Sequence, residues 1–186
     1  MTRNSIPATK LSRALFVAVA VAVAGLAAIG CEQDPSATRP AVKFDPCTPV
    51  TLVPDVTATD VQLQGLTAGA ALWNASASTD LLPAAVGSGS AGPTLPIHFQ
   101  VAAAPFHGLY DPSSGQVYVN DDLTGEELAI TIAHEIGHSF GLVHIPADQR
   151  TSLMNPANLT VLPTAADVST LAGLWGRCGS LDAGTE

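Results

Sequence analysis

Residues 134–144 read HEIGHSFGLVH, and this stretch decides both the fold and the chemistry that we predict for the chain. The residues before it favour a helix, because Thr124 and Glu127 have the spacing of a capping box. An apolar stripe continues at helical spacing through Leu128, Ile132, Ala133, Ile136 and Phe140. We therefore predict a helix from about Gly125 to Phe140.

Two histidines of this helix are placed to share one metal ion. His134 and His138 are one helical turn apart, so their side chains project from the same face. Gly141 can take the left-handed conformation that ends a helix, and the turn can bring His144 back as a third ligand. Three neutral imidazoles leave one tetrahedral position for water, as in catalytic zinc sites. Glu135 is placed as general base and then proton donor, since zinc lowers the pKa of bound water toward ~7.

This arrangement predicts hydrolysis of peptide bonds. With the residue frequencies of this chain, the full pattern of His134, Glu135, His138, Gly141 and His144 at this spacing is expected by chance in roughly one chain in 10⁵. The competing hypothesis is a non-enzymatic surface lipoprotein or binding module in which zinc only stabilises the fold. Glu135 disfavours it, because a structural zinc site needs no base and commonly has a fourth protein ligand.

The segment 134–144 resembles the zinc signature of the metzincin metallopeptidases, and Gly137 and Leu142 most resemble the matrixin branch of that family. Residues 152–156, SLMNP, resemble the family's Met-turn, in which Met154 would support the metal site from below. The resemblance implies an α+β fold, a small metzincin-like (zincin) catalytic domain. Its parts would be a twisted mixed sheet, an active-site helix and a C-terminal helix.

The resemblance also implies where a substrate binds. Residues 115–122 resemble the edge strand and acidic turn on which matrixins hold extended peptides by strand addition, and Gln116–Asn120 also alternates like a strand. Residues 156–158 replace the frequent Pro-x-Tyr of the family, which leaves the shape of the pocket after the scissile bond open. The substrate-binding residues implied are Val117, Tyr118, Val119, Pro156 and Asn158.

Other elements are predicted from spacing and composition. Asp60 is expected to cap a helix with an apolar stripe made of Leu63, Leu66, Ala70 and Trp73. Residues 83–96 have loop composition, and a strand is expected at Ile97–Val101. Residues 164–176, which start with a Thr-x-x-Asp cap, resemble the C-terminal helix of the metzincin fold.

The sequence also contains candidate ligands for further metal ions. Matrixins commonly hold a structural zinc through histidines, one of them in the edge strand where this chain has Tyr118, so we expect that second site to be absent. Two other histidines are expected as surface or hydrogen-bonded core residues rather than as ligands: His98 and His107. Calcium could bind three carboxylates, although solvated turn acids are the favoured interpretation: Asp111, Asp121 and Asp122.

Residues 1–30 have the layout of a secretory signal, with a basic start, a charge-free apolar run and small residues before Cys31. Ala28-Ile29-Gly30-Cys31 resembles a bacterial lipobox, in which Cys31 would be lipidated; a single-span anchor is the alternative. We expect an exported lipoprotein anchored on the periplasmic or cell-surface side, or otherwise a secreted protein. The remaining chain divides into a flexible tether at 31–46, a metzincin-like zinc peptidase domain at 47–178 and a C-terminal tail at 179–186.

Cys47 and Cys178 lie near the two ends of the predicted domain, and export would make a disulfide between them possible. Closing a loop of this length contributes roughly 4–5 kcal/mol in the chain-entropy model. The alternative is that the Cys47 thiolate caps the metal of a latent enzyme, but no recognisable pro-segment motif surrounds it.

The charge balance limits the classes of binding partner that we expect. The chain has 7 Lys+Arg against 16 Asp+Glu, and removal of residues 1–30 takes away three basic residues and no acid. Nucleic acid is therefore not an expected partner, because its binding depends on basic residues. Membrane contact is expected only through the signal or a lipid anchor, and a monomer is expected. The predicted partner is a protein or peptide in extended conformation, cleaved by a zinc-dependent endopeptidase.

Overall fold

The computed structural model describes residues 43–90 and 92–179. The predicted signal at 1–30, the lipidation site Cys31, most of the tether and residues 180–186 of the tail lie outside the described residues. No helix in the described ranges combines the length and the apolar character needed to cross a bilayer.

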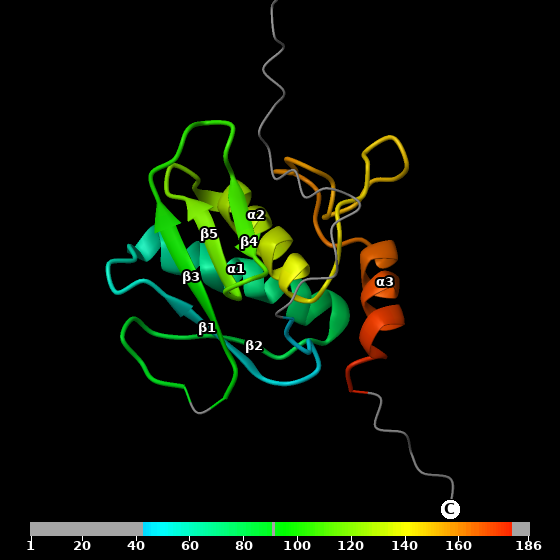
Figure 1. Ribbon diagram of the computed structural model, residues 1–186, viewed down its shortest axis with the longest axis horizontal. Helices are drawn as coiled ribbons and strands as arrows, with labels where there is room; N and C mark the ends of the chain where they lie inside the picture. Colours follow the sequence, from blue (N-terminus) through cyan, green and yellow to red (C-terminus); the bar gives the residue numbers. More distant parts are fainter. Residues whose placement is uncertain (1–42, 91, 180–186) are drawn as a thin grey trace, which may run out of the picture.

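A five-stranded mixed sheet forms the centre of the domain. Its strands are β1 (Val50–Pro54), β2 (Leu81–Pro83), β3 (Thr94–Gln100), β4 (Gly108–Asp111) and β5 (Gln116–Asn120). Their order is β2-β1-β3-β5-β4, and all neighbours pair in parallel except β4, which runs antiparallel to β5. Helices α1 and α2 cover one face of this sheet, while α3 stands beside it (Figure 1). The predicted fold class is confirmed.

Helix α1 (Asp60–Ala77) begins one residue earlier than a cap at Asp60 would require. Thr59 is the N-cap and forms a capping box with Gln62, so the prediction for Asp60 is wrong. Two glycines of α1 face the active-site helix. A Cβ at Gly65 would lie 2.4 Å from Leu128 Cδ2, and one at Gly69 would lie 2.9 Å from the Ala129 carbonyl oxygen. The glycines therefore allow the two helices to pack closely, although each lowers helix propensity.

Helix α2 (Gly125–Ser139) is the predicted active-site helix, and every residue from 128 to 139 is buried. Thr124 is its N-cap, but the Thr124 side chain makes no capping hydrogen bond, so the predicted capping box is absent. The helix ends at Phe140, and Gly141 follows with a φ of 92°. That left-handed conformation favours glycine and turns the chain back over the helix end, as predicted.

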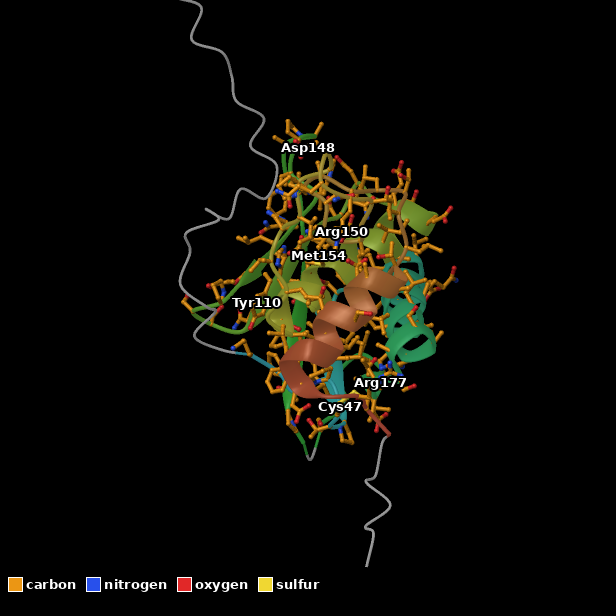
Figure 2. The ribbon with its side chains drawn as sticks, turned by 90° about the vertical axis from the view of Figure 1, so that its right-hand side faces the viewer. Cys47, Tyr110, Asp148, Arg150, Met154 and Arg177 are labelled. Carbon is orange, nitrogen blue, oxygen red and sulfur yellow. A yellow bond between two sulfur atoms is a disulfide. The ribbon has the colours of Figure 1, made fainter. Side chains whose placement is uncertain are left out.

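Helix α3 (Ala165–Trp175) starts with the predicted cap, since Thr164 and Asp167 form a reciprocal capping box. Its far end is fastened twice. The Trp175 indole N–H donates to the Phe140 carbonyl at 2.7 Å, and Cys178 forms a disulfide with Cys47. Figure 2 shows Cys47 at the lower end of α3 and Met154 near its upper end. Because Cys47 is in a disulfide, it does not act as a metal-capping thiolate here.

Two boundaries and the place of one strand differ from the sequence predictions. The strand expected at 97–101 starts at Thr94, inside the segment predicted as a loop. Its first residues, Pro96 among them, pair with β1, and this pairing extends the strand. Packing of the domain begins before Cys47, since Phe44 contacts the core and its N–H donates to the Ser139 carbonyl at 2.9 Å. The strand at Gln116–Asn120 exists as β5, but it is not the edge of the sheet.

Candidate metal centre

Three histidines converge at the end of α2. His134 and His138 come from consecutive turns of the helix, and His144 comes from the segment that turns back after Gly141. Their Nε2 atoms lie 3.1 Å apart in all three pairs. These residues form the only group of three or more potential metal ligands in the described part of the chain.

Hydrogen bonds from Nδ1 to backbone carbonyl oxygens fix the orientation of two of the rings. The Nδ1 atom of His134 lies 2.8 Å from the Leu153 carbonyl oxygen, and that of His138 lies 2.9 Å from the Leu142 carbonyl oxygen. A carbonyl only accepts hydrogen bonds, so each Nδ1–H donates and each neutral ring keeps a lone pair on Nε2. Lone pairs directed at one point by histidine rings form the ligand set of a divalent cation.

Burial keeps these imidazoles in the form that binds metal. Desolvation lowers the pKa of His134 to about 4, although the hydrogen bond to Leu153 opposes this shift. Desolvation and the neighbouring histidines lower the pKa of His138 well below its ordinary value, and desolvation lowers that of His144. All three rings are therefore neutral near pH 7, as coordination requires.

The spacing of the nitrogens fits zinc. Tetrahedral zinc with Zn–N distances of about 2.0–2.1 Å separates two ligand nitrogens by about 3.3 Å. The 3.1 Å separations between the Nε2 atoms are close to that value. Since only three protein ligands are present in the group, one tetrahedral position remains for water or substrate.

Glu135 lies on α2 between the two helix histidines and is buried, with 1% of its surface exposed. Its side chain contacts the start of β4. A Cβ at Gly108 would lie 2.9 Å from both Cγ and Oε1 of Glu135. The edge strand therefore passes directly against this carboxylate, and the lack of a side chain at Gly108 leaves room for it.

Met154 packs beneath the helix, where the Met-turn resemblance implied it would be. Its side chain is buried, and a Cβ at Gly137 would lie 2.6 Å from its Sδ atom. Trp73 contacts the same position from α1, and its indole N–H donates to the Ala133 carbonyl at 2.8 Å. Gly137 is thus enclosed between Met154 and Trp73, on the turn that separates the two histidine ligands.

The predicted substrate-binding strand is wrong in its position. Strand β5 pairs with β3 on one side and β4 on the other, so its main chain is already used within the sheet. Val117 and Val119 are fully buried in the core. Tyr118 points to the opposite face, where its ring stacks on His98 with centroids 5.1 Å apart. The edge strand on this side of the sheet is β4, whose four residues carry too short a pattern to recognise.

The other two predicted substrate residues follow the Met-turn. Pro156 is exposed. The Asn158 side chain donates to the carbonyls of Leu153 and Val161 and accepts from the N–H groups of Thr160 and Val161. Its amide therefore organises this loop and is not available to a substrate, which corrects the role predicted for Asn158.

The residues considered for further metal sites have other contacts. His98 lies 2.8 Å from Asp55 through Nδ1, so it is a hydrogen-bonded residue, as the favoured interpretation had it. The Asp111 carboxylate accepts hydrogen bonds from Ser113 and Ser114 and closes the turn before β5. In the described ranges no group of potential metal ligands includes Asp111, Asp121 or Asp122, and calcium is not supported.

Sequence reasoning missed two supporting residues. Gly108 had no motif around it. Asp167 was identified only as a helix cap, yet it is fully buried and accepts hydrogen bonds from the Met-turn as well as from α3. The presence of an aspartate at this position was a weak signal of a second role, because the third residue of a capping box is usually Glu or Gln.

Comparisons with known proteins agree with this geometry. A family model described as "Metallo-peptidase family M12B Reprolysin-like" matches residues 106–170, which include the three histidines. The solved "Crystal structure of myroilysin" is similar with a TM-score of 0.53 and 16% identity, covering 74% of this chain and 87% of that chain. A second one, "Structure of Myroilysin", has a TM-score of 0.56 and 15% identity, covering 81% and 92%. No curated protein matches the sequence.

The likeness to myroilysin shows the fold. The family match and the histidine triad support a metallopeptidase of the metzincin type with zinc as its metal. The closer resemblance to matrixins, which rests on Gly137 and Leu142, stays a prediction.

Proposed function

We propose that this protein is a zinc-dependent endopeptidase that cleaves extended polypeptides outside the cytoplasm. One observation carries the proposal: three histidine Nε2 atoms lie 3.1 Å apart, and a buried glutamate stands beside them on the same helix. The reprolysin-like family match over residues 106–170 supports it, because the matched segment contains all four residues.

Each residue then has a defined task. A zinc ion held by His134, His138 and His144 would lower the pKa of a bound water and polarise the scissile carbonyl. Glu135 accepts the proton of the attacking water and passes it to the leaving amine nitrogen. Leu153 and Leu142 hold two of the rings through their carbonyl oxygens, so the imidazole nitrogens stay directed at one point.

The substrate binds along β4. This strand is the last in the sheet order and pairs with β5 on one side. Its first residue, Gly108, contacts Glu135, so a peptide that pairs with the outer edge of β4 passes beside the general base. Main-chain pairing of this kind recognises an extended peptide with limited demand on its side chains.

Two finer points belong to the proposal. We propose the matrixin branch on the basis of Gly137 and Leu142, and export as a lipoprotein or secreted protein on the basis of the segment before Cys31. The Cys47–Cys178 disulfide supports an extracytoplasmic location, because such bonds persist in oxidising compartments.

The test compares the purified protein with its Glu135→Ala variant on an unstructured protein substrate. We expect zinc-dependent cleavage by the wild type, loss on chelation and recovery with added zinc. Glu135→Ala should bind zinc as tightly as the wild type but lose activity by about 10²–10⁴-fold, the contribution of a general base. Glu126→Ala, an exposed glutamate in the first turn of the same helix, is the matched control and should remain active.

Two results would contradict the proposal. One is cleavage by Glu135→Ala at the wild-type rate. The other is a zinc-loaded wild type that cleaves nothing in a broad peptide library, which would favour a zinc-stabilised binding module.

A further inference from the structure

The carboxylate of Asp167 is buried completely and joins two separate segments. Oδ1 accepts hydrogen bonds from the Ser152 hydroxyl and, at 3.3 Å, from Arg150 Nη2. Oδ2 accepts from the Leu153 N–H at 2.9 Å and from the N–H and hydroxyl of Thr164 at 2.9 and 2.8 Å. One side chain thus connects the Met-turn to the start of α3.

The main chain of Leu153 continues this connection to the metal centre. Its N–H donates to Asp167, and its carbonyl accepts from Nδ1 of His134 at 2.8 Å. Asn158 donates to the same carbonyl at 3.1 Å. The main chain of one residue, Leu153, therefore separates the Asp167 carboxylate from the His134 ring, whose Nε2 belongs to the histidine triad.

A helix cap alone does not require this arrangement. The capping box of α3 involves only Thr164 and Asp167, and neither of its hydrogen bonds requires the contacts of Asp167 with Ser152 and Leu153. Burial by itself would raise the pKa of Asp167, but the hydrogen bonds from Ser152, Thr164 and Leu153 outweigh it and hold the pKa below its ordinary value. The carboxylate is therefore ionised, which strengthens its hydrogen bond with Leu153.

The C-terminal end of α3 is also attached to the domain, which restricts movement of the helix that carries Asp167. Trp175 donates to the carbonyl of Phe140, the residue that ends α2, and Cys178 is bonded to Cys47. In Figure 2, Met154 and Arg150 lie at the upper end of α3, and Cys47 and Arg177 lie at its lower end. Since both ends of the helix are attached to the domain, the carboxylate cannot shift without moving α3.

We propose that Asp167 is a positioning residue for the zinc ligand His134, acting through the main chain of Leu153. The inference rests on the proposed metal centre. Asp167 touches neither metal nor substrate. It fixes the Leu153 carbonyl, which fixes the tautomer and the plane of the His134 ring, so the triad is organised before the ion arrives.

The test measures the metal centre and not catalysis. Zinc affinity is determined by competition with a chromophoric chelator, and the visible absorption of the cobalt-substituted protein reports ligand geometry. Asp167→Ala should bind zinc about 10-fold more weakly, the lower end of the range for outer-shell partners, and should change the cobalt spectrum. Asp167→Asn, which keeps an oxygen for the Leu153 N–H, should recover most of the affinity.

Thr164→Val is the matched control. It removes the hydroxyl that caps α3 but leaves the bonds between Asp167 and the Met-turn, so thermal stability should fall while the cobalt spectrum stays that of the wild type. If Asp167→Ala does not fold, Asp167→Glu replaces it. Glutamate suits the capping box but moves the carboxylate by one methylene, and the spectrum should still change.

The proposal is overturned if Asp167→Ala, or Asp167→Glu in its place, keeps the affinity and the spectrum of the wild type. It is also overturned if Thr164→Val changes the spectrum as much as Asp167→Ala does, because Asp167 would then act only through the helix cap. A protein that binds zinc but cleaves no peptide would contradict the peptidase proposal alone, since these measurements do not depend on cleavage.

Discussion

The sulfur of Met154 lies directly against Gly137, the residue that separates the two histidine ligands of α2. A Cβ at position 137 would be 2.6 Å from Met154 Sδ and 3.3 Å from Trp73 Cζ2. The glycine in the zinc signature is therefore a packing requirement of the Met-turn, and the spacing of the signature and the position of the methionine depend on each other.

Gly137→Ala should destabilise the protein despite the higher helix propensity of alanine. The added methyl group has no space between Met154 and Trp73, and such overpacking costs about 1–3 kcal/mol. Denaturant unfolding of the zinc-free protein measures the change. Gly173→Ala in α3 is the control, because its Cβ would contact nothing within 4 Å, and it should be neutral or stabilising by up to about 1 kcal/mol. Equal effects of the two substitutions would contradict the packing argument.

Gly108→Ala should reduce the turnover number while leaving bound zinc unchanged. Its Cβ would lie 2.9 Å from Glu135 Oε1 and from Thr131 Cγ2, so the general base must move. A displacement of this size costs on the order of 100-fold in rate. Steady-state kinetics with zinc analysis tests it, and Gly92→Ala, whose nearest neighbour would be 3.8 Å away, is the control. Normal turnover by Gly108→Ala would show that the contact does not position Glu135.

The zinc-free protein should lose stability in acid. The pKa of His134 is about 4 in the folded state, against about 6.5 when unfolded, so the unfolded state binds more protons as the pH falls below 6.5. The free energy of unfolding should then decrease by up to about 1.4 kcal/mol per pH unit for each such histidine, from pH ~6.5 toward 4. His138 and His144 shift in the same direction.

Unfolding of chelator-treated protein across this pH range measures the slope. His134→Asn should show a shallower dependence, since it lacks one of the titrating rings. A slope that does not change in this variant would contradict the assignment of the effect to the triad.

Removal of the disulfide should loosen α3. The Cys47–Cys178 bond closes a long loop and fastens the end of the helix that carries Asp167. The double variant Cys47→Ser/Cys178→Ser should lose about 2–5 kcal/mol of stability. Thermal unfolding before and after reduction of the wild type gives the same comparison, and the double variant should not respond to reductant.

The sequence predicted the active-site helix and the triad well because their signals are local. Helical spacing, the glycine after Phe140 and the histidine pattern each lie within one turn or the next. Trp73 and Leu66 were placed in the core for the same reason, because the apolar stripe of α1 is regular and the residues are buried.

Contacts between distant segments were not predictable in this way. Strand β4 has four residues, and its place at the edge depends on β5 lying between it and β3. Gly65 and Gly69 carry no helical signal, yet they set the distance between α1 and α2. The second role of Asp167 arises only when the Met-turn folds against α3. In each case a contact between segments distant in the sequence determines the structure, and no local pattern encodes that contact.

The most direct test of the account is a crystal structure of the purified protein with anomalous diffraction measured at the zinc absorption edge. The account predicts one zinc ion bound by Nε2 of His134, His138 and His144 at about 2.0–2.1 Å, with a water in the fourth position beside Glu135. A fourth protein ligand that closes this position, or zinc bound away from the three histidines, would contradict it.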